Sequence, residues 1–150
     1  MRLRGFEFIT TYKNTNLILP IRKTQHSAGY DIAAAEDTIL RPSVTTLIAT
    51  GLKAYMLGDE YLGIHIRSGL SVKNELSLIN GQGIIDADYY NNTDNEGHIL
   101  IAVFNHNSQE ILISKGTRIA QGIFYKYLVA DHDEKKSFVT RTGGIGSTGE

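Results

Sequence analysis

The sequence has 150 residues, the length of one ordinary domain. Fifteen Lys and Arg residues nearly balance 16 Asp and Glu residues, so no overall basic field predicts binding to a nucleic-acid polymer, and an anionic ligand needs a local site. There is no cysteine, which excludes disulfides and thiolate metal sites. No segment approaches the roughly 18 apolar residues of a membrane span and no signal peptide is recognisable, so we expect a soluble protein of the cytoplasm.

Short apolar stretches recur along the chain and predict β-strands: residues 61–66 and 109–114 alternate with a period of two, and residues 44–48 and 99–104 are runs rich in β-branched or aromatic residues. In chain order they cover residues 28–35, 44–48, 61–66, 99–104, 109–114 and 116–121. Gly, Asn, Asp and Pro residues interrupt them at a spacing of about ten residues, and only residues 71–76 favour a short helical turn. The pattern predicts an all-β domain over residues 1–140, with a jelly-roll-like β-barrel as the expected architecture.

The first of these stretches carries one acidic residue, Asp31, among small and apolar neighbours. Because burial of an unpaired carboxylate is costly, Asp31 needs either a partner or a function. A paired structural group is the commoner outcome.

The segment Arg67-Ser68-Gly69-Leu70 follows the stretch 61–66. Backbone N–H groups at a Ser-Gly turn can form a nest for an anion, and the guanidinium of Arg67 would add bidentate charge. The alternative is a solvated arginine at the end of a strand, which is the more common state of this residue type.

The most informative stretch is NGQGIIDADYY, residues 80–90. Its two glycines allow the backbone to approach a ligand closely, and two carboxylates and two tyrosines follow within five residues. On strand geometry Asp86 and Asp88 share one face, whereas a turn would separate them. An ordinary polar hairpin tip is the alternative interpretation.

The segment from Gly116 to Gln121 predicts a turn that enters a strand, with Arg118 and Ala120 on the face opposite Ile119 and Gln121.

The last ten residues, RTGGIGSTGE, contain four glycines. Such a segment has little to bury, so we expect residues 141–150 to form a flexible arm that is mobile without a ligand. The five histidines show no paired metal-ligand spacing and are expected to be structural or surface residues.

Five segments, AGYDIAA, RSGL, NGQGIIDADYY, GTRIAQ and RTGGIGSTG, stand in a fixed order between about Ser27 and Gly149. Together they resemble the five motifs of the homotrimeric dUTP pyrophosphatases (dUTPases), with some similarity to phage or prophage members. The resemblance implies a trimeric jelly-roll β-barrel that hydrolyses dUTP to dUMP and pyrophosphate. Such a reaction limits uracil in DNA and supplies dUMP for thymidylate synthesis.

The resemblance also implies a role for each motif residue. Asp86 would activate a water that attacks the α-phosphorus in line, and Mg²⁺ would be held by the nucleotide phosphates and waters rather than directly by the protein. The implied phosphate-binding residues are Arg67, Ser68, Gly69, Gln121, Arg141, Ser147 and Thr148. The implied base- and sugar-binding residues are Asn80, Gly83, Ile84, Ile85, Tyr89 and Ile145. Asp31 would organise the site through water or an arginine.

In this scheme Asn80 and the backbone from Gly83 to Ile85 read the edge of uracil, and Tyr89 leaves no space for a ribose 2′-hydroxyl. The glycine-rich arm closes over the nucleotide as a lid, with Ile145 covering the base. In a trimer the arm is expected to reach a site built by the two other subunits.

The sequence departs from the family pattern in two places. The glycine expected soon after the motif tyrosine is delayed to Gly97, which predicts an enlarged loop from Tyr90 to Gly97. Ile145 stands where the family usually has a phenylalanine, so we expect weaker binding of the base, by roughly 0.5–1.5 kcal/mol of lost stacking, and retained activity.

Three other functions fit parts of the sequence. A dCTP deaminase of the same fold needs a glutamate near residues 80–90, and the first one after them is Glu96, in the enlarged loop. A nucleotide-dependent regulatory protein could bind a partner through that loop. A jelly-roll binding or capsid module is the third alternative, and it predicts no release of pyrophosphate.

Overall fold

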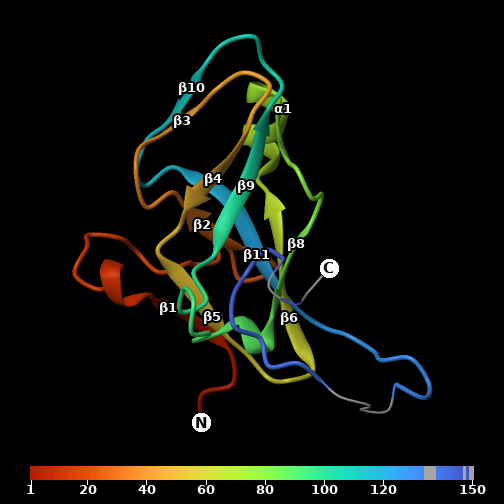
Figure 1. Ribbon diagram of the computed structural model, residues 1–150. Helices are drawn as coiled ribbons and strands as arrows, with labels where there is room; N and C mark the ends of the chain where they lie inside the picture. The colour runs from red at the N-terminus through yellow and green to blue at the C-terminus, as the bar shows by residue number, and fades with distance from the viewer. Residues whose placement is uncertain (134–137, 147, 149–150) are drawn as a thin grey trace.

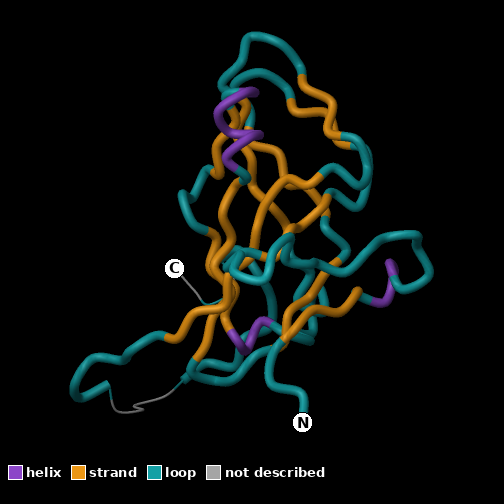
Figure 2. Tube along the Cα trace, turned by 180° about the vertical axis from the view of Figure 1, so that it is seen from behind, coloured by secondary structure: helices purple, strands orange, loops and turns teal. Residues whose placement is uncertain are grey.

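The strands of the protein wrap around one core, as the computed structural model shows for residues 1–133, 138–146 and 148 (Figures 1 and 2). The described residues form 11 β-strands, one short α-helix and two turns of 3₁₀ helix. The prediction of an all-β, jelly-roll-like fold is therefore confirmed. None of the helices in these ranges is long and apolar enough to cross a membrane.

Two larger antiparallel sheets form the body of the barrel. The first has the order β2-β11-β6-β8, with bounds Tyr30–Ala33, Arg118–Lys126, Glu60–Ile66 and Gly83–Asp86. The second has the order β4-β9-β7, with bounds Thr45–Ala49, Leu100–Asn105 and Leu76–Leu78. Two pairs complete the fold, β1 with β5 (Gly5–Phe8, Leu52–Tyr55) and β3 with β10 (Thr38–Leu40, Ile111–Ile113).

The core is filled by the inward-facing residues of these strands. Fully buried apolar side chains come from both larger sheets, for example Ile32 and Leu62 from the first and Ile48 and Ile101 from the second. The period of two seen in the sequence is thus the inside–outside alternation of the strands.

The alternation predicted for residues 116–121 is wrong at one position. The register of β11 against β2 shifts between Arg118 and Ala120, and Ile119 and Ala120 are both fully buried. A β-bulge at this point places two successive residues toward the core, which a strict period of two cannot anticipate.

The helix α1 spans Ser68–Asn74, so it begins three residues before the predicted turn at residues 71–76. The carbonyl of Arg67 accepts hydrogen bonds from the N–H groups of Leu70 and Ser71, both at 3.0 Å, and so closes the first turn directly after β6. The segment RSGL is therefore the start of a helix and not a separate turn. Glu75, with φ 49°, ends the helix in the left-handed region.

The stretch 80–90 is not a β-hairpin. β7 pairs with β9 and β8 pairs with β6, so the turn at residues 79–82 connects two sheets. β8 ends at Asp86, because Ala87–Tyr89 form a turn of 3₁₀ helix (η2). Asp86 and Asp88 therefore do not share a strand face, and the alternative with a turn is the correct one.

Asn105 is a polar residue with no exposed surface at the end of β9. Its Nδ2 donates to the carbonyls of Leu40 and Gln109, both at 2.9 Å, and its Oδ1 accepts from the N–H of Asn107 at 2.9 Å. The side chain thus joins β9, β3 and the loop before β10 in a region that water does not reach.

We predict that Asn105→Ala lowers the free energy of unfolding by about 1–3 kcal/mol, because it leaves buried carbonyl and N–H groups without partners. Urea unfolding followed by circular dichroism measures the change. Gln109→Ala is the matched control: its carbonyl stays in place and its side chain is exposed, so its midpoint should stay near that of the native chain. Equal midpoints for both variants would contradict the role given to Asn105.

Candidate active site

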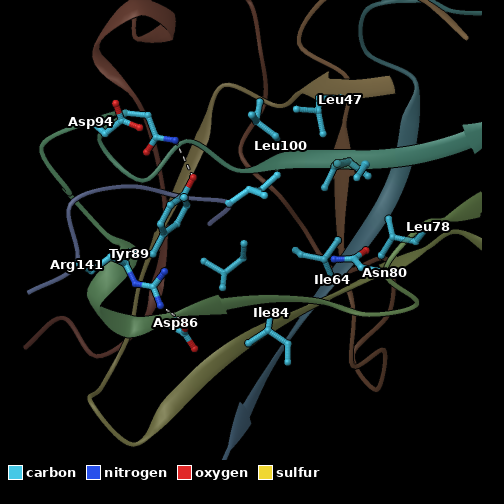
Figure 3. A pocket seen from close by; sticks show the side chains of 17 residues that line it. Leu47, Ile64, Leu78, Asn80, Ile84, Asp86, Tyr89, Asp94, Leu100 and Arg141 are labelled. Carbon is cyan, nitrogen blue, oxygen red and sulfur yellow. Dashed lines mark hydrogen bonds and ion pairs between the residues drawn. The ribbon is translucent and has the colours of Figure 1, made fainter. Parts of the chain in front are cut away.

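A cavity of about 450 Å³ opens between β8 and the sheet that contains β9. One end holds Asp86, Tyr89 and Arg141, and the other holds Asn80, beside Ile64 (Figure 3). Residues from five strands, from the turn before β8, from η2, from the enlarged loop and from the C-terminal arm line it. They are Leu47, Ile64, Leu78, Asn80, Gly83, Ile84, Ile85, Asp86, Tyr89, Asp94, Asn95, Leu100, Ile101, Ala102, Arg141, Gly144 and Ile145.

The wall that β8 contributes is the edge of a sheet. Within the described ranges β8 pairs only with β6, with Gly83 opposite Ile64 and Asp86 opposite Tyr61. The N–H and C=O groups on the outer side of an edge strand are not used by the sheet, and here they border the cavity. The apolar side chains around them exclude water, which favours a flat ligand that hydrogen-bonds with the strand backbone.

Arg141 connects the arm to the two carboxylates of the 80–90 stretch. Its Nη2 lies 2.6 Å from Oδ2 of Asp86, and its Nε lies 2.7 Å from Oδ1 of Asp88. The guanidinium is mostly buried, with 17% of its side chain exposed, whereas Asp86 is 49% exposed. A half-exposed carboxylate beside a buried cation is thus fixed at the rim of the cavity.

Tyr89 stands at the same end, with only 8% of its surface exposed. Its hydroxyl donates to the carbonyl of His98 at 2.7 Å and accepts from Nδ2 of Asn95 at 2.8 Å. Burial lowers the pKa of His98, whose Nε2 accepts from the N–H of Gly51 at 3.0 Å. The hydroxyl of Tyr89 is therefore held by two neutral groups, the backbone carbonyl of His98 and the side-chain amide of Asn95.

The arm crosses this end of the cavity in its own chain. The carbonyl of Thr142 accepts from the N–H of Asp94 at 3.0 Å, and a Cβ added at Gly144 would lie 3.2 Å from the Tyr89 hydroxyl. Ile145 lines the cavity mouth and is 87% exposed, and Thr148 is exposed. Ser147 lies outside the described residues. The expected mobility of the arm stays a prediction.

A second, shallower cleft lies beside α1. It is lined by Arg67, Gly69, Leu70, Lys73, Asn74, Gly116, Thr117 and Arg118. Asp31, on β2, binds two of its cations: Oδ1 lies 3.4 Å from Nε of Arg67, and Oδ2 lies 2.9 Å from Nη1 of Arg118. Gln121 is opposite Asp31 in the sheet and packs against Gly29.

The predicted site residues therefore fall into two groups within one chain. Asp86 lies opposite Tyr61 of β6. Tyr61 lies six residues before Arg67, which directly follows the end of β6. At about 3.3 Å per residue, the two groups are separated by about 20 Å along β6. In both views α1 and η2 lie toward opposite ends of the molecule (Figures 1 and 2).

The cavity group contains Asn80, Gly83, Ile84, Ile85, Asp86, Tyr89, Arg141 and Ile145. The cleft group contains Asp31, Arg67 and Gly69, with Ser68 between the last two and Gln121 beside Asp31.

Sequence reasoning missed several residues of these groups, among them Asp94, Asn95, Lys73 and Arg118. Asn95 and Asp94 come from the enlarged loop, whose path across Tyr89 no local pattern reveals. The sequence pattern predicts a strand position for Arg118 but no role in a site. In the structure Arg118 lines the second cleft together with Arg67 and Lys73. The signal for Arg118 was its place in the motif GTRIAQ.

The fold is a β-barrel whose apolar cavity is bordered by strand backbone and has a carboxylate at its rim. This arrangement is typical of an enzyme that binds a small polar ligand. The family model for dUTPase matches residues 15–149. The chain therefore belongs to the dUTPase family, and its activity is the hydrolysis of dUTP to dUMP.

Individual relatives agree with this assignment. The deoxyuridine 5′-triphosphate nucleotidohydrolase of Lactococcus lactis is 52% identical over 99% of each chain. The crystal structure of dUTPase from Streptococcus mutans is 46% identical with a TM-score of 0.81, covering 85% of this chain and 98% of that one. The dUTPase from phage phi11 of S. aureus has a TM-score of 0.74 at 20% identity, covering 91% and 98%, which shows a shared fold.

Proposed function

We propose that Asp86 is the catalytic carboxylate, which orients and deprotonates the water that attacks the α-phosphorus of dUTP. The observation that carries this proposal is the position of Asp86: it ends the edge strand β8, lines the cavity and keeps half of its side chain exposed. A general base needs such access to water together with a fixed direction. The attacked phosphorus would lie at this rim, in line with the leaving pyrophosphate.

The base would bind at the other end of the cavity. The uracil edge offers one N–H donor and two carbonyl acceptors, which match the unused C=O and N–H groups along β8 from Gly83 to Ile85. The amide of Asn80 lies at the same end (Figure 3). A Cβ at Gly83 would lie 3.1 Å from that of Ile64, a tight contact that favours glycine at this position. Cytosine presents the opposite pattern of donor and acceptor and would leave buried polar groups unpaired.

Tyr89 would contact the deoxyribose between the base and the phosphates. Its ring is nearly buried and is fixed through its hydroxyl, so it does not move aside at low cost. A ribose 2′-hydroxyl would meet this ring, so the contact would select dUTP over UTP.

The phosphates require more positive charge than the cavity rim offers, because Arg141 is its one lining cation among the described residues. Arg67, Lys73 and Arg118 supply that charge in the second cleft, with Gln121, Ser68 and the Gly69 amide as hydrogen-bond donors. Since cleft and cavity are about 20 Å apart in one chain, the cleft of one copy would complete the cavity of another. A homotrimer with shared sites meets this requirement.

The arm would act as the lid of this shared site. Arg141 forms ion pairs with Asp86 and Asp88. A bound triphosphate would compete for the same guanidinium and release Asp86 for the attacking water. Thr148 and Ser147 would then add hydroxyl donors to the phosphates, and Ile145 would cover the base.

Mg²⁺ fits this site as an ion carried by the substrate. The described residues contain no group of three or more His, Asp or Glu side chains that could hold a metal, so the phosphate oxygens and waters are the donors that suit it. When bound, the ion would neutralise charge that develops on the departing pyrophosphate.

The dCTP deaminase alternative receives no support from the cavity. Glu96 is the glutamate that such a reaction would need, but its carboxylate binds Lys53 at 3.4 Å and the N–H of Thr10 at 3.1 Å. It is not among the residues that line the cavity. No observation in the described residues favours the regulatory alternative, because the enlarged loop contacts Tyr89 and the arm of its own chain.

We predict that Asp86→Asn reduces kcat for dUTP by at least about 100-fold, the usual contribution of a positioned general base, with KM changed little. Pyrophosphate release in the presence of Mg²⁺ is the measurement. Asp88→Asn is the matched control, because it removes the other carboxylate of the same arginine fork and should keep most of the activity. If instead Asp88→Asn is inactive and Asp86→Asn is not, the catalytic assignment is wrong.

We predict that Tyr89→Ala raises the ratio of kcat/KM for UTP to that for dUTP by about tenfold or more, since a cavity replaces the ring that meets the 2′-hydroxyl. The same assay with both nucleotides measures it. An unchanged ratio would remove the role given to Tyr89 and leave that of Asp86 untouched.

A further inference from the structure

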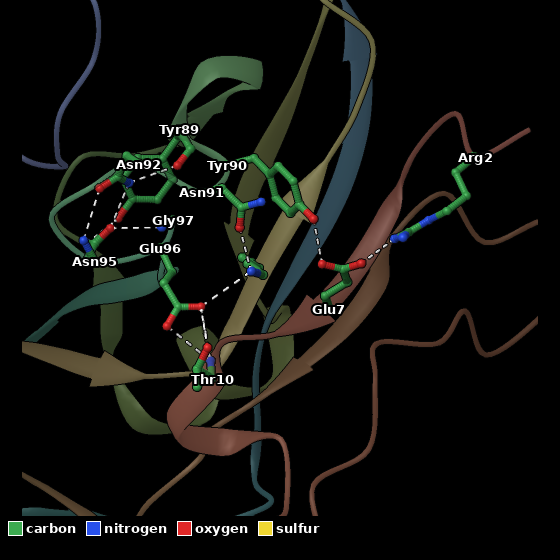
Figure 4. A network of polar contacts seen from close by, with 11 residues as sticks. Arg2, Glu7, Thr10, Tyr89, Tyr90, Asn91, Asn92, Asn95, Glu96 and Gly97 are labelled. Atoms are coloured by element: carbon green, nitrogen blue, oxygen red, sulfur yellow. Dashed lines mark hydrogen bonds and ion pairs between the residues drawn. The ribbon is translucent and has the colours of Figure 1, made fainter.

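The enlarged loop from Tyr90 to Gly97 contributes Asp94 and Asn95 to the cavity wall and carries a network of polar contacts (Figure 4). Asn92 is nearly buried and organises its centre: Oδ1 accepts from the N–H groups of Asp94 and Asn95, each at 3.0 Å, and Nδ2 donates to the carbonyl of Tyr89 at 2.8 Å. A side-chain amide that bonds to nearby backbone groups replaces the regular pairing that a loop lacks. The loop is therefore folded back onto Tyr89.

Asn95 uses both ends of its amide. Its Oδ1 accepts from Nδ2 of Asn92 at 2.8 Å and from the N–H of Gly97 at 3.0 Å. Its Nδ2 donates to the hydroxyl of Tyr89 at 2.8 Å. The oxygen thus stabilises the fold of the loop, whereas the nitrogen holds Tyr89, a residue of the cavity wall.

A second set of contacts ties the loop to the barrel. Lys53 on β5 is buried, and its Nζ donates to Oδ1 of Asn91 at 2.6 Å and pairs with Glu96 at 3.4 Å. Glu96 in turn accepts from the N–H and hydroxyl of Thr10, at 3.1 and 3.0 Å. Both ends of the loop are therefore attached to other elements, and Asn95 has a fixed base from which to hold Tyr89.

The residue after Tyr89 is anchored as well. The hydroxyl of Tyr90 donates to Oε2 of Glu7 at 2.6 Å, and Arg2 pairs with the same carboxylate. This hydrogen bond raises the pKa of Tyr90, and together with Arg2 it lowers the pKa of Glu7. The backbone directly after Tyr89 is thus held in place. The orientation of the Tyr89 ring then depends on the hydrogen bonds of its hydroxyl.

We propose that Asn95 is a positioning residue that determines selectivity for the 2′-deoxy sugar, by holding the Tyr89 ring against the cavity through its Nδ2. The proposal rests on the contact assigned to Tyr89 in the proposed function. It gives the enlarged loop a task in substrate selection. The loop supplies the hydrogen-bond donor on one side of the phenol, and the carbonyl of His98 supplies the acceptor on the other.

The substitution Asn95→Asp separates the two ends of the amide. It keeps an oxygen that accepts from Asn92 and Gly97, and so preserves the fold of the loop. It replaces the donor to Tyr89 with an acceptor, so the phenol can no longer satisfy both neighbours at once. Asn16→Asp is the matched control, because Asn16 is an exposed loop residue and the change adds the same charge.

The experiment measures kcat/KM for dUTP and UTP in the full-length protein, for the native chain, Asn95→Asp, Tyr89→Phe and the double variant. We expect the UTP-to-dUTP ratio to rise roughly 3- to 10-fold in Asn95→Asp, the effect of one hydrogen bond. The ratio should rise similarly in Tyr89→Phe and no further in the double variant, because both changes break the same contact. Asn16→Asp should leave the ratio unchanged, and thermal unfolding checks that each variant is folded.

Two results would overturn the proposal, and they differ in what else they affect. If Tyr89→Ala relaxes the ratio while Asn95→Asp does not, or if the two single changes add fully in the double variant, Asn95 does not act through Tyr89 and the proposed function stands. If Tyr89→Ala leaves the ratio unchanged, the sugar contact itself is wrong and the role of Asn95 is lost with it.

Discussion

The position of β8 as an edge strand is the constraint on which the site depends. Pairing with β6 on one side fixes Asp86 opposite Tyr61 and sets the direction of its carboxylate. On the other side, the unpaired backbone borders the cavity and supplies polar groups without polar side chains. A strand added at this edge would cover the backbone, and a longer β8 would carry Asp86 away from the rim. The turn of 3₁₀ helix at Ala87–Tyr89 ends the strand directly after Asp86, the carboxylate that we propose as catalytic, and places Tyr89 at the same end of the cavity.

The strand β6 also supports the proposal that the site is shared between chains. Its start positions the cavity through Tyr61, and its end leads into Arg67 and α1, where most of the described cations that suit phosphate are gathered. A rigid strand of seven residues keeps these two groups apart. Charge and shape therefore favour assembly, in which each copy offers its cleft to a neighbour's cavity. The ion pairs that Asp31 makes with Arg67 and Arg118 hold these two arginines together in that cleft.

Much of this arrangement could be predicted from the sequence, because strands buried on one face show a period of two and the motifs retain their order. The stretches 61–66 and 99–104 lie within one residue of β6 and β9. The errors have physical reasons: the bulge at Ile119 breaks the period, the Arg67 carbonyl starts α1 early, and pairing with distant strands separates β7 from β8. Asn95 could not be found, because its contact with Tyr89 depends on how a loop folds in three dimensions. Asp86 and Tyr89 were recognisable from their motif.

The central claim is that the cavity of one copy is completed by the cleft of another. The most direct test mixes two inactive variants, Asp86→Asn and Arg67→Gln, by denaturing and refolding them together. If the site is shared, some sites in the mixed trimers combine an intact Asp86 with an intact Arg67 from another chain, and about a quarter of the native activity returns. If each chain builds its own site, every site keeps one defect. An activity no greater than that of the separate variants, with mixed trimers shown by native mass spectrometry, would contradict the account.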